Sequence, residues 1–303
     1  MSGHGGRAIV AALGANLGIA VMKFVAFAIT GSSSMLAEGA HSVVDSGNQA
    51  LLLIGGRRSR RAATPEHPFG YGRDRYVYGF LVALMLFTGG GLFACYEGVS
   101  KLRHPHHLDS PAVALVVLVL AVGLEGFSLR TAIAESRGPK GADSWLGFIR
   151  HAKTPELPVV LLEDAAALLG LVLALGGVGL ATATGQPAWD GIGTVGIGVL
   201  LLVVAVVLIV ETKSLLLGES ASPAQVRRIA ESLVGEGIER VVHLRTMHLG
   251  PDEVLVAAKV ALPPQVPLAS VAASIDAAEA RVRSAVPQAR VIYLEPDLDR
   301  GPG

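Results

Sequence analysis

The sequence is short of cysteine and short of charge. Cys95 is the only cysteine in 303 residues, which excludes an intrachain disulfide framework and a zinc site built from cysteine thiolates. Charged residues make up 17% of the chain and hydrophobic residues 51%, whereas a typical soluble domain carries about 25% charged residues. The 25 basic and 25 acidic side chains cancel, so no nucleic-acid partner is expected. This balance indicates a membrane protein.

Long hydrophobic runs fill the first two thirds of the chain. A helix of about 20 apolar residues crosses the hydrocarbon core of a bilayer. The first run is too long for the apolar part of a signal peptide, so we expect it to be retained as a membrane helix. The six expected spans are residues 7–30, 34–56, 76–100, 111–134, 158–182 and 190–212.

The loops predict how these spans are oriented. RRSRRAATPEHPFGYGRDR and ESRGPKGADSWLGFIRHAK are rich in Arg and Lys, whereas GSSS and TATGQPAW carry neither and KLRHPHHLDS carries only Lys101 and Arg103. The positive-inside rule then places the two basic loops and both termini in the cytoplasm. We expect a multi-pass protein embedded in the lipid bilayer of a bacterial inner membrane.

The character of the sequence changes after residue 213. Two amphipathic segments, 221–236 and 268–286, predict helices, while RVVHLRTMHL, EVLVAAKVAL and VIYLEP predict strands. The order α-β-β-α-β predicts a small ferredoxin-like α+β domain with an antiparallel sheet. We therefore divide the chain into a six-helix transmembrane domain, 1–213, and a cytoplasmic domain, 214–303.

Charged residues interrupt the second span, in AEGAHSVVDSGNQA. An ionisable group near the bilayer centre costs about 2.5–3.5 kcal/mol to insert, so it persists where it is paired, wetted or binds a ligand. His41 and Asp45 are four residues apart and share a helix face. Imidazole and carboxylate together suit a divalent ion such as zinc, although a structural His–Asp hydrogen bond explains this pair equally well.

The fifth span, LPVVLLEDAAALLGLVLALGG, adds Glu163 and Asp164. Adjacent residues point about 100° apart around a helix, since a turn holds 3.6 residues, so the two acids need not face one site. An acidic pair without a basic neighbour in its own helix favours a visiting cation. The remaining polar residues of the spans are expected to have packing, interface or proton-pathway roles: Asn16, Lys23, Asn48, Glu97, Glu125 and Asp190.

Taken together, these segments resemble the cation diffusion facilitator family over essentially the whole chain. The resemblance is carried by GSSSMLAEGAHSVVDSGNQ, HPFGYGRDRYVY, LLEDAAALLGL and MHLGPDEVLVAAKV, and the third of these is similar to the branch that contains zinc transporter nine. It implies a homodimeric antiporter, not an enzyme and without a prosthetic group, that exchanges a divalent cation for protons by alternating access. The Gly-rich TGGGLF and GIGTVGIGVLL would allow the close helix approach that such motion needs.

The resemblance also implies a ligand set for the cation. Family members place two ligands four residues apart on the second helix and two on the fifth, which correspond here to His41, Asp45 and Asp164. The fourth position, usually His, is Val160, so Glu163 or water is the candidate for the fourth ligand. Zn²⁺ is the expected cargo, with Mn²⁺, Fe²⁺ and Co²⁺ as alternatives.

Secondary metal sites of the family are only partly matched. His67, His248 and Glu295 fall at positions that hold ligands in other members, but Tyr71 stands where a second His is common. The sequence therefore favours a cytoplasmic domain without a metal site. Two rival functions stay open: a non-transporting regulatory homologue, favoured by the missing His, and a membrane-embedded hydrolase, which lacks a GxSxG or HExxH motif.

Overall fold

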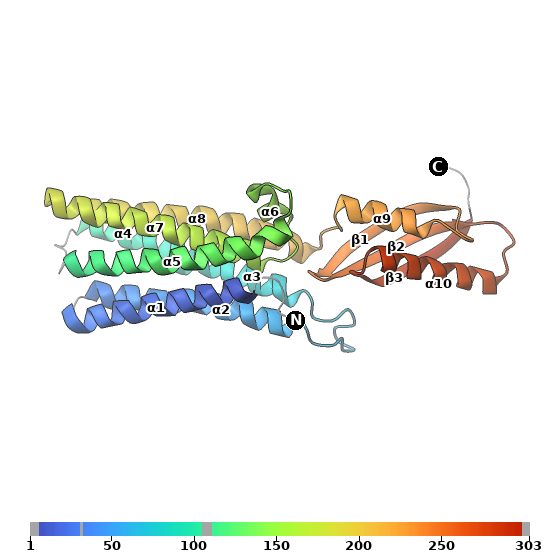
Figure 1. The fold of residues 1–303 in the computed structure, drawn as a ribbon, viewed down its shortest axis with the longest axis horizontal. Coiled ribbons are helices and arrows are strands. Elements are labelled where there is room, and N and C mark those ends of the chain that lie inside the picture. The colour runs from blue at the N-terminus through green and yellow to red at the C-terminus, as the bar shows by residue number, and fades with distance from the viewer. Residues whose placement is uncertain (1–5, 31–32, 105–110, 299–303) are drawn as a thin grey trace. The chain divides into compact units, whose positions relative to one another are not determined.

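The computed structural model describes residues 6–30, 33–104 and 111–298. They form two compact units, which we call the helical unit (residues 1–58 and 75–213) and the C-terminal unit (residues 59–74 and 214–303). Figure 1 shows the first as a bundle of long helices and the second as helices packed on a sheet. Each unit is described by itself below.

The helical unit is built from long helices that match the six expected spans. Five segments within the described residues are long and apolar enough to cross a membrane. The sixth, α2 (Ser33–Arg58), is a helix of 26 residues that is more polar than the others. The others are α1 (Gly6–Thr30), the third span made of α3 (Asp74–Met85), η1 (Leu86–Leu92) and α4 (Phe93–Arg103), α5 (Pro111–Lys140), α7 (Glu156–Thr184) and α8 (Ala188–Leu217).

Glycine allows two of these spans to approach closely. The third span contains a π-helical segment, η1, around its three consecutive glycines. Further along, Gly98 of α4 and Gly198 of α8 both lie against the facing helix: a Cβ at Gly198 would be 2.6 Å from the Cys95 backbone nitrogen. The glycine-rich segments therefore pack backbone against backbone, as the sequence predicts.

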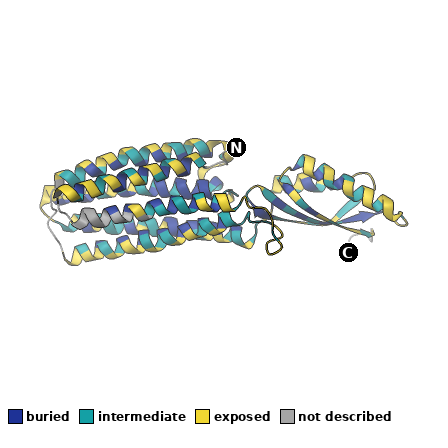
Figure 2. Ribbon diagram, turned by 90° about the horizontal axis from the view of Figure 1, so that it is seen from below, coloured by how far each residue is buried: buried dark blue, intermediate teal, exposed yellow. Residues whose placement is uncertain are grey.

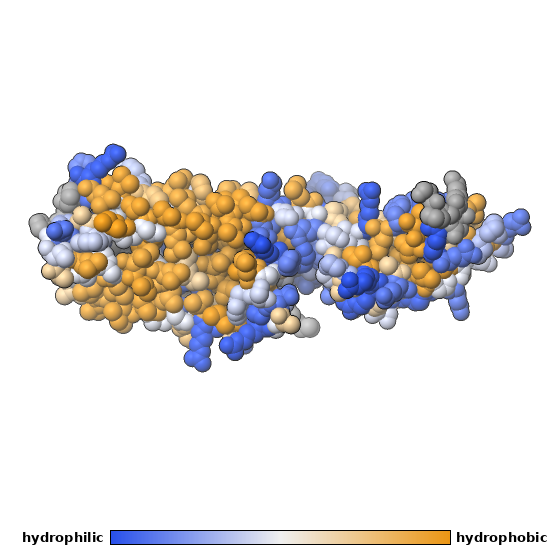
Figure 3. Space-filling view, turned by 90° about the horizontal axis from the view of Figure 1, so that it is seen from above, coloured by the Kyte–Doolittle hydropathy of each residue, from blue (hydrophilic) through white to orange (hydrophobic). Residues whose placement is uncertain are grey.

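The outer surface of the helical unit is apolar. Phe127 of α5 and Val203 of α8 are 64% and 58% exposed, and the space-filling view shows hydrophobic side chains covering most of the helices on this face (Figure 3). Exposed side chains of this kind suit lipid, because hydrocarbon does not penalise them as water does. The structure and composition together define an integral multi-pass membrane protein.

One element of the helical unit was not predicted. Residues 145–151, expected to be part of a loop, form a short helix, α6 (Trp145–His151). The Ser144 hydroxyl caps it by accepting a hydrogen bond from the Gly147 backbone N–H at 3.0 Å, and Phe148 is buried. A serine cap and one buried aromatic side chain are enough to stabilise a helix of one or two turns. Such a helix is too short to show a periodic pattern in the sequence.

The C-terminal unit contains α9 (Pro223–Leu233), β1 (Arg240–Gly250), β2 (Glu253–Leu262), α10 (Leu268–Ala285) and β3 (Ala289–Leu298). The order of elements is as predicted, and α9 begins with a capping box between Ser222 and Gln225. Apolar residues from the strands and helices form its core, including Ile229, Leu233, Val256, Val260 and Val282. Figure 2 shows buried positions on the strands of this unit and exposed ones on its helices, and along β2 buried residues alternate with partly exposed ones.

The expectation of a purely antiparallel sheet was wrong. The strand order is β1-β2-β3; β1 and β2 pair antiparallel, but β2 and β3 pair parallel. The chain leaves β2, passes through α10 and returns beside β2 in the same direction. A crossover that contains a helix permits parallel pairing, whereas a tight hairpin does not.

Candidate functional site

Asp164 is buried in the helical unit and accepts a hydrogen bond from a neighbouring helix. Its side chain lies on α7 and is 2% exposed. The Ser128 hydroxyl of α5 donates a hydrogen bond of 2.6 Å to Asp164 Oδ2, and Ser128 itself is completely buried. The carboxylate therefore has a fixed orientation inside the bundle, toward α5.

Glu163, the next residue, faces a different helix. Asn48 Nδ2 donates to Glu163 Oε1 at 3.0 Å, and Gln49 Nε2 donates to Glu163 Oε2 at 2.9 Å. Gln49 in turn accepts a hydrogen bond from Asn16 of α1 at 3.2 Å. This buried network joins α1, α2 and α7, and it places both oxygens of Glu163 on amide groups.

Asp45 and the surrounding polar groups of α1 and α2 lie nearby. Asp45 is half-buried, and the Lys23 ammonium of α1 donates to the Ser42 hydroxyl of α2 at 3.1 Å. The charges of Asp164, Asp45 and Lys23 all act on Glu125 of α5, and those of Asp45 and Asp164 also act on Glu163. The acids of α2, α5 and α7 therefore form one electrostatically coupled group, which we call the acidic cluster: Asp45, Glu125, Glu163 and Asp164.

His41 belongs to the helix α2, but its side chain lies outside the part of the structure that is described. Val160 of α7 is fully buried and apolar, so it supplies no ligand atom. Among the side chains that are described, no three from His, Cys, Asp and Glu converge closely enough to hold a metal ion. The expected ligands Asp45 and Asp164 are thus brought into one region without forming a closed cage.

Two predicted secondary ligands are far apart within the C-terminal unit. His248, 3% exposed, pairs with Val254 across β1 and β2. Glu295 pairs with Lys259 across β2 and β3, and its carboxylate forms an ion pair of 2.9 Å with the Lys259 ammonium. Five residues of strand at about 3.3 Å each separate the two positions by roughly 16 Å. One chain does not bring them to a common ion.

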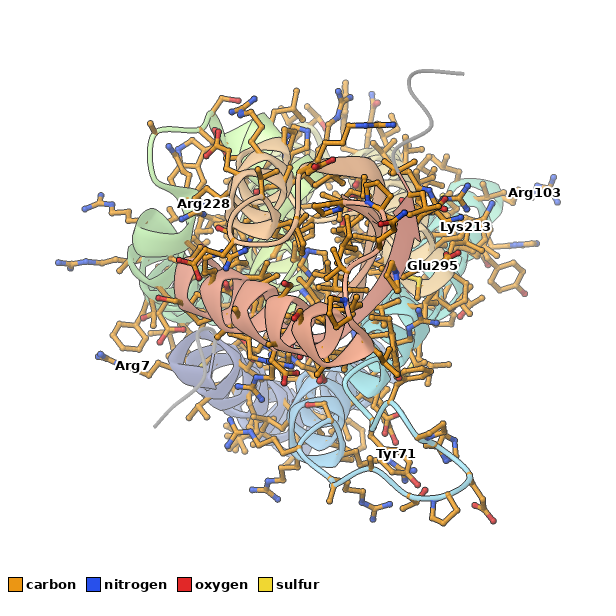
Figure 4. The ribbon with its side chains drawn as sticks, turned by 90° about the vertical axis from the view of Figure 1, so that its right-hand side faces the viewer. Arg7, Tyr71, Arg103, Lys213, Arg228 and Glu295 are labelled. Atoms are coloured by element: carbon orange, nitrogen blue, oxygen red, sulfur yellow. The ribbon has the colours of Figure 1, made fainter. Side chains whose placement is uncertain are left out.

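The third predicted secondary ligand, His67, lies on the exposed loop between α2 and α3. Its ring packs against Tyr71 with the ring centroids 4.6 Å apart. Figure 4 shows Tyr71 on this loop and Glu295 on β3, on separate elements. The ring contact with Tyr71 accounts for the position of the His67 imidazole.

The sequence did not predict that Glu125 and Ser128 of α5 lie beside the expected ligands. From the sequence, Glu125 has only a general packing, interface or proton-pathway role, and Ser128 is not singled out. The two are three residues apart and therefore share one face of α5. That spacing was a usable signal, because a buried Glu and Ser on one face of an apolar helix need polar partners on a neighbour.

Comparison with known proteins assigns the class and then the family. Residues 9–217 match the family described as "Cation efflux transmembrane domain", and residues 220–297 match "Cation efflux protein, cytoplasmic domain". The chain belongs to the cation efflux family, also called the cation diffusion facilitators. The resemblance drawn from its motifs is confirmed.

Relatives come from animals, plants and bacteria. The chain is 35% identical over 258 residues to the Xenopus laevis protein named "Proton-coupled zinc antiporter SLC30A9, mitochondrial", covering 84% of this chain and 46% of that protein. It is 30% identical over 237 residues to "Metal tolerance protein C4" of Arabidopsis thaliana, covering 78% and 52%. With "Cation-efflux pump FieF" of Pectobacterium atrosepticum the identity is 28% over 301 residues, covering 97% and 93%. The chain spans about half the length of the first two relatives.

Proposed function

We propose that this chain is a transporter that carries a divalent metal cation across a membrane in exchange for protons, and that it is not an enzyme. Zn²⁺ is the proposed cargo, with Mn²⁺, Fe²⁺ and Co²⁺ as alternatives. Residues 1–213 form the transport domain and residues 214–303 a cytoplasmic domain, with both termini in the cytoplasm of a bacterial cell. The working assembly is a homodimer. The names of the relatives support the cargo and the proton coupling, and the family match supports the two domains. The distribution of basic residues among the loops supports the orientation.

The observation that carries this proposal is the buried carboxylate of Asp164 on an apolar helix, close enough to further acids for their charges to interact. Burying several like charges is costly unless something cationic compensates them. A divalent cation entering between α2 and α7 would do so, with His41 and Asp45 from α2 and Asp164 from α7 as ligands. The amide partners of Glu163 favour a positioning role for that residue, because they tie α7 to α2.

Proton coupling follows from the chemistry of these ligands. An imidazole has an ordinary pKa of about 6.5 and must be neutral to bind a metal. Protons and the cation therefore compete for the same atoms. If the bundle opens to one side at a time, cation bound on one side leaves on the other as protons replace it, which is how secondary transporters work about a midplane site.

The proposal is tested by zinc uptake into proteoliposomes under an imposed pH gradient. The full-length protein should accumulate zinc when the gradient is present, and Asp45→Ala should abolish accumulation. Transport that survives Asp45→Ala and Asp164→Ala would show that these residues are not on the cation's path.

A regulatory homologue that does not transport is the second candidate, because Val160 is buried and apolar where the family usually has His. The same vesicles discriminate between the two functions. If the wild-type protein moves neither zinc nor manganese, iron or cobalt, the regulatory function stands and the transport proposal is overturned.

A further inference from the structure

Glu125 is the one acid of the helical unit's described interior whose carboxylate is left without a bonding partner. Among its described residues the unit buries four acids, Glu125 and three that are paired. Those three have partners: Glu156 an ion pair with Arg75, Glu163 the amides of Asn48 and Gln49, and Asp164 the Ser128 hydroxyl. Glu125, 4% exposed, forms no hydrogen bond or ion pair with any residue that the structure describes.

Its position connects it to the expected cation site. Glu125 lies one turn before Ser128 on the same face of α5, and Ser128 is the residue that binds Asp164. Helix α5 packs against both α1 and α7. The charges of Asp164 and Asp45 act on Glu125, as does the Lys23 ammonium. The carboxyl group therefore faces the interior, toward the acidic cluster, and not the lipid.

A packing role does not explain this arrangement. A buried polar group kept for structure is normally hydrogen-bonded, because an unbonded one costs the full loss of its hydration. The Lys23 ammonium acts on Glu125 through its charge and donates a hydrogen bond to Ser42. A buried oxygen without a hydrogen-bond partner among the described residues, Asn48 Oδ1, lies one turn after Asp45 on α2. Unsatisfied oxygens around acids are what a hard cation binds.

The expected ligand set also lacks a fourth member, which Glu125 can supply. Val160 has no donor atom, and the oxygens of Glu163 are engaged by amides. We propose that Glu125 is the fourth protein ligand of the transported cation, contributed by α5 beside His41, Asp45 and Asp164. This inference rests on the proposed function. It requires the three carboxylates to draw together around the ion, which offsets their mutual repulsion.

The ligand type has a consequence for selectivity. With Glu125 the site has three carboxylates and one imidazole, which is richer in oxygen than a site with two imidazoles. Oxygen ligands suit manganese better than they suit zinc. Removing the Glu125 charge should therefore weaken binding of Mn²⁺ more than binding of Zn²⁺.

The experiment measures metal binding by the purified full-length protein in detergent. Zn²⁺ and Mn²⁺ affinities come from competition with a chromophoric chelator, and Co²⁺ absorption reports the number and type of ligands. Glu125→Gln removes the charge with little change of shape. The matched control is Glu97→Gln: Glu97 is an acid of α4 that pairs with Lys101 at 3.5 Å and takes no part in the acidic cluster. Asp164→Asn is the reference for loss of the site.

We expect Glu125→Gln to weaken Zn²⁺ binding by roughly 10- to 100-fold, since even an outer-shell partner is worth that much, and to alter the Co²⁺ spectrum. Glu97→Gln should bind as the wild type does. If Glu125→Gln binds all three ions like the wild type while Asp164→Asn does not, the role of Glu125 is overturned and the proposed function stands. If Asp164→Asn also binds normally, both are overturned.

A folding defect is separated by a second variant. Should Glu125→Gln elute as aggregate, Glu125→Asp keeps the charge and draws the carboxylate back by about one C–C bond, roughly 1.5 Å. A changed Co²⁺ spectrum in this variant supports ligation by residue 125. An unchanged spectrum, with unchanged Zn²⁺ affinity, overturns it.

Discussion

Both units of the chain have an apolar core, but they differ in the polar side chains that they bury beside it. In the C-terminal unit His248 is the sole polar side chain among the described residues that is buried, and the interior is aliphatic. The helical unit buries Gln49, Glu125 and Asp164, while large apolar side chains such as Phe127 cover its surface. The difference follows from the solvent. Water drives apolar groups inward, whereas hydrocarbon leaves a polar group nowhere favourable except the interior.

The two units also differ in how much polar interactions contribute to joining their elements. In the helical unit polar residues connect helices, as in the network of Asn16, Gln49 and Glu163. In the C-terminal unit most polar side chains lie on the surface, so we expect most of them to contribute little to the stability of the unit. Removing a polar partner should therefore harm the helical unit more than the C-terminal unit. The following experiments test this contrast from the largest expected effect to the smallest.

The largest expected difference in stability is between the loss of a buried ion pair in the helical unit and the loss of an exposed one in the C-terminal unit. Arg75 of α3 binds Glu156 of α7 through two contacts, one of them 2.9 Å between Arg75 Nη2 and Glu156 Oε2, and both side chains are largely buried. Glu156→Ala should cost about 3–5 kcal/mol, because it removes the carboxylate that pairs with a buried guanidinium. Equilibrium unfolding in mixed micelles measures the loss.

The matched control for this ion pair is Glu279→Ala in α10, whose pair with Arg283 is 2.7 Å long but exposed on the arginine side. Its removal should cost only about 0.3–0.5 kcal/mol, as for other pairs one helical turn apart. Equal losses in the two variants would refute the contrast between the units.

Truncating an apolar side chain to alanine should have the opposite pattern, with the larger loss of stability in the C-terminal unit. Leu233→Ala removes a fully buried side chain from the core of the C-terminal unit and should destabilise that unit by about 2–5 kcal/mol. Phe127→Ala removes a larger but 64% exposed side chain from α5 and should change stability far less, because lipid replaces the lost contacts. Proteolysis of the C-terminal unit and thermal aggregation of the whole chain follow the two losses separately. A larger effect from Phe127→Ala would mean that this surface faces protein.

Close helix packing predicts a smaller effect that is confined to the helical unit. A Cβ at Gly198 would meet the Cys95 backbone nitrogen and Sγ at 2.6 Å, whereas one at Gly126 meets nothing within 4 Å. Gly198→Ala should therefore destabilise by about 1–3 kcal/mol through overpacking. Gly126→Ala should be neutral or stabilise by up to about 1 kcal/mol, since alanine is the better helix former. Both are measured by unfolding in the same micelles.

The smallest effect concerns charge on the sheet of the C-terminal unit. The carboxylates of Glu295 and Asp297 raise the pKa of Lys259 above its ordinary value. The stabilisation from these pairs is fully present below the pKa of the unfolded chain, about 10.4, and is lost as pH rises through the higher folded value. Unfolding midpoints should therefore fall between pH 10 and 12, by about the margin typical of exposed pairs. Lys259→Met should remove that part of the pH dependence; a fall of the same size in this variant would trace it to other groups.

The sequence predicted the elements well because their signals are local. Six apolar spans and the order α-β-β-α-β depend on periodicity and length, which neighbouring residues determine. Two predictions failed where the decision was not local. The helix at Trp145–His151 depends on the burial of Phe148 and one serine cap, and the direction of β3 depends on how α10 returns the chain to β2.

At the candidate site, too, the sequence predicted what depends on local signals and missed what depends on packing. His41, Asp45, Glu163 and Asp164 are candidate site residues from the sequence alone, because charged residues are conspicuous in apolar helices. The different surroundings of Glu163 and Asp164 were not readable, because adjacent positions on a helix face different neighbours and only packing decides which. Glu125 was undervalued for the same reason: its lack of a bonding partner is a property of α5 among its neighbours and not of the residues around it in the chain.

The sequence by itself determined the membrane class, the number of spans, the family resemblance and the residues that bring charge into the bilayer, since each follows from composition and spacing. The tertiary structure alone decided which of those charges are satisfied. Hydrogen bonds from Asn48, Gln49 and Ser128 reach their carboxylates across 36 to 115 residues of sequence. Such contacts depend on how the helices pack, and packing is set by many residues acting together.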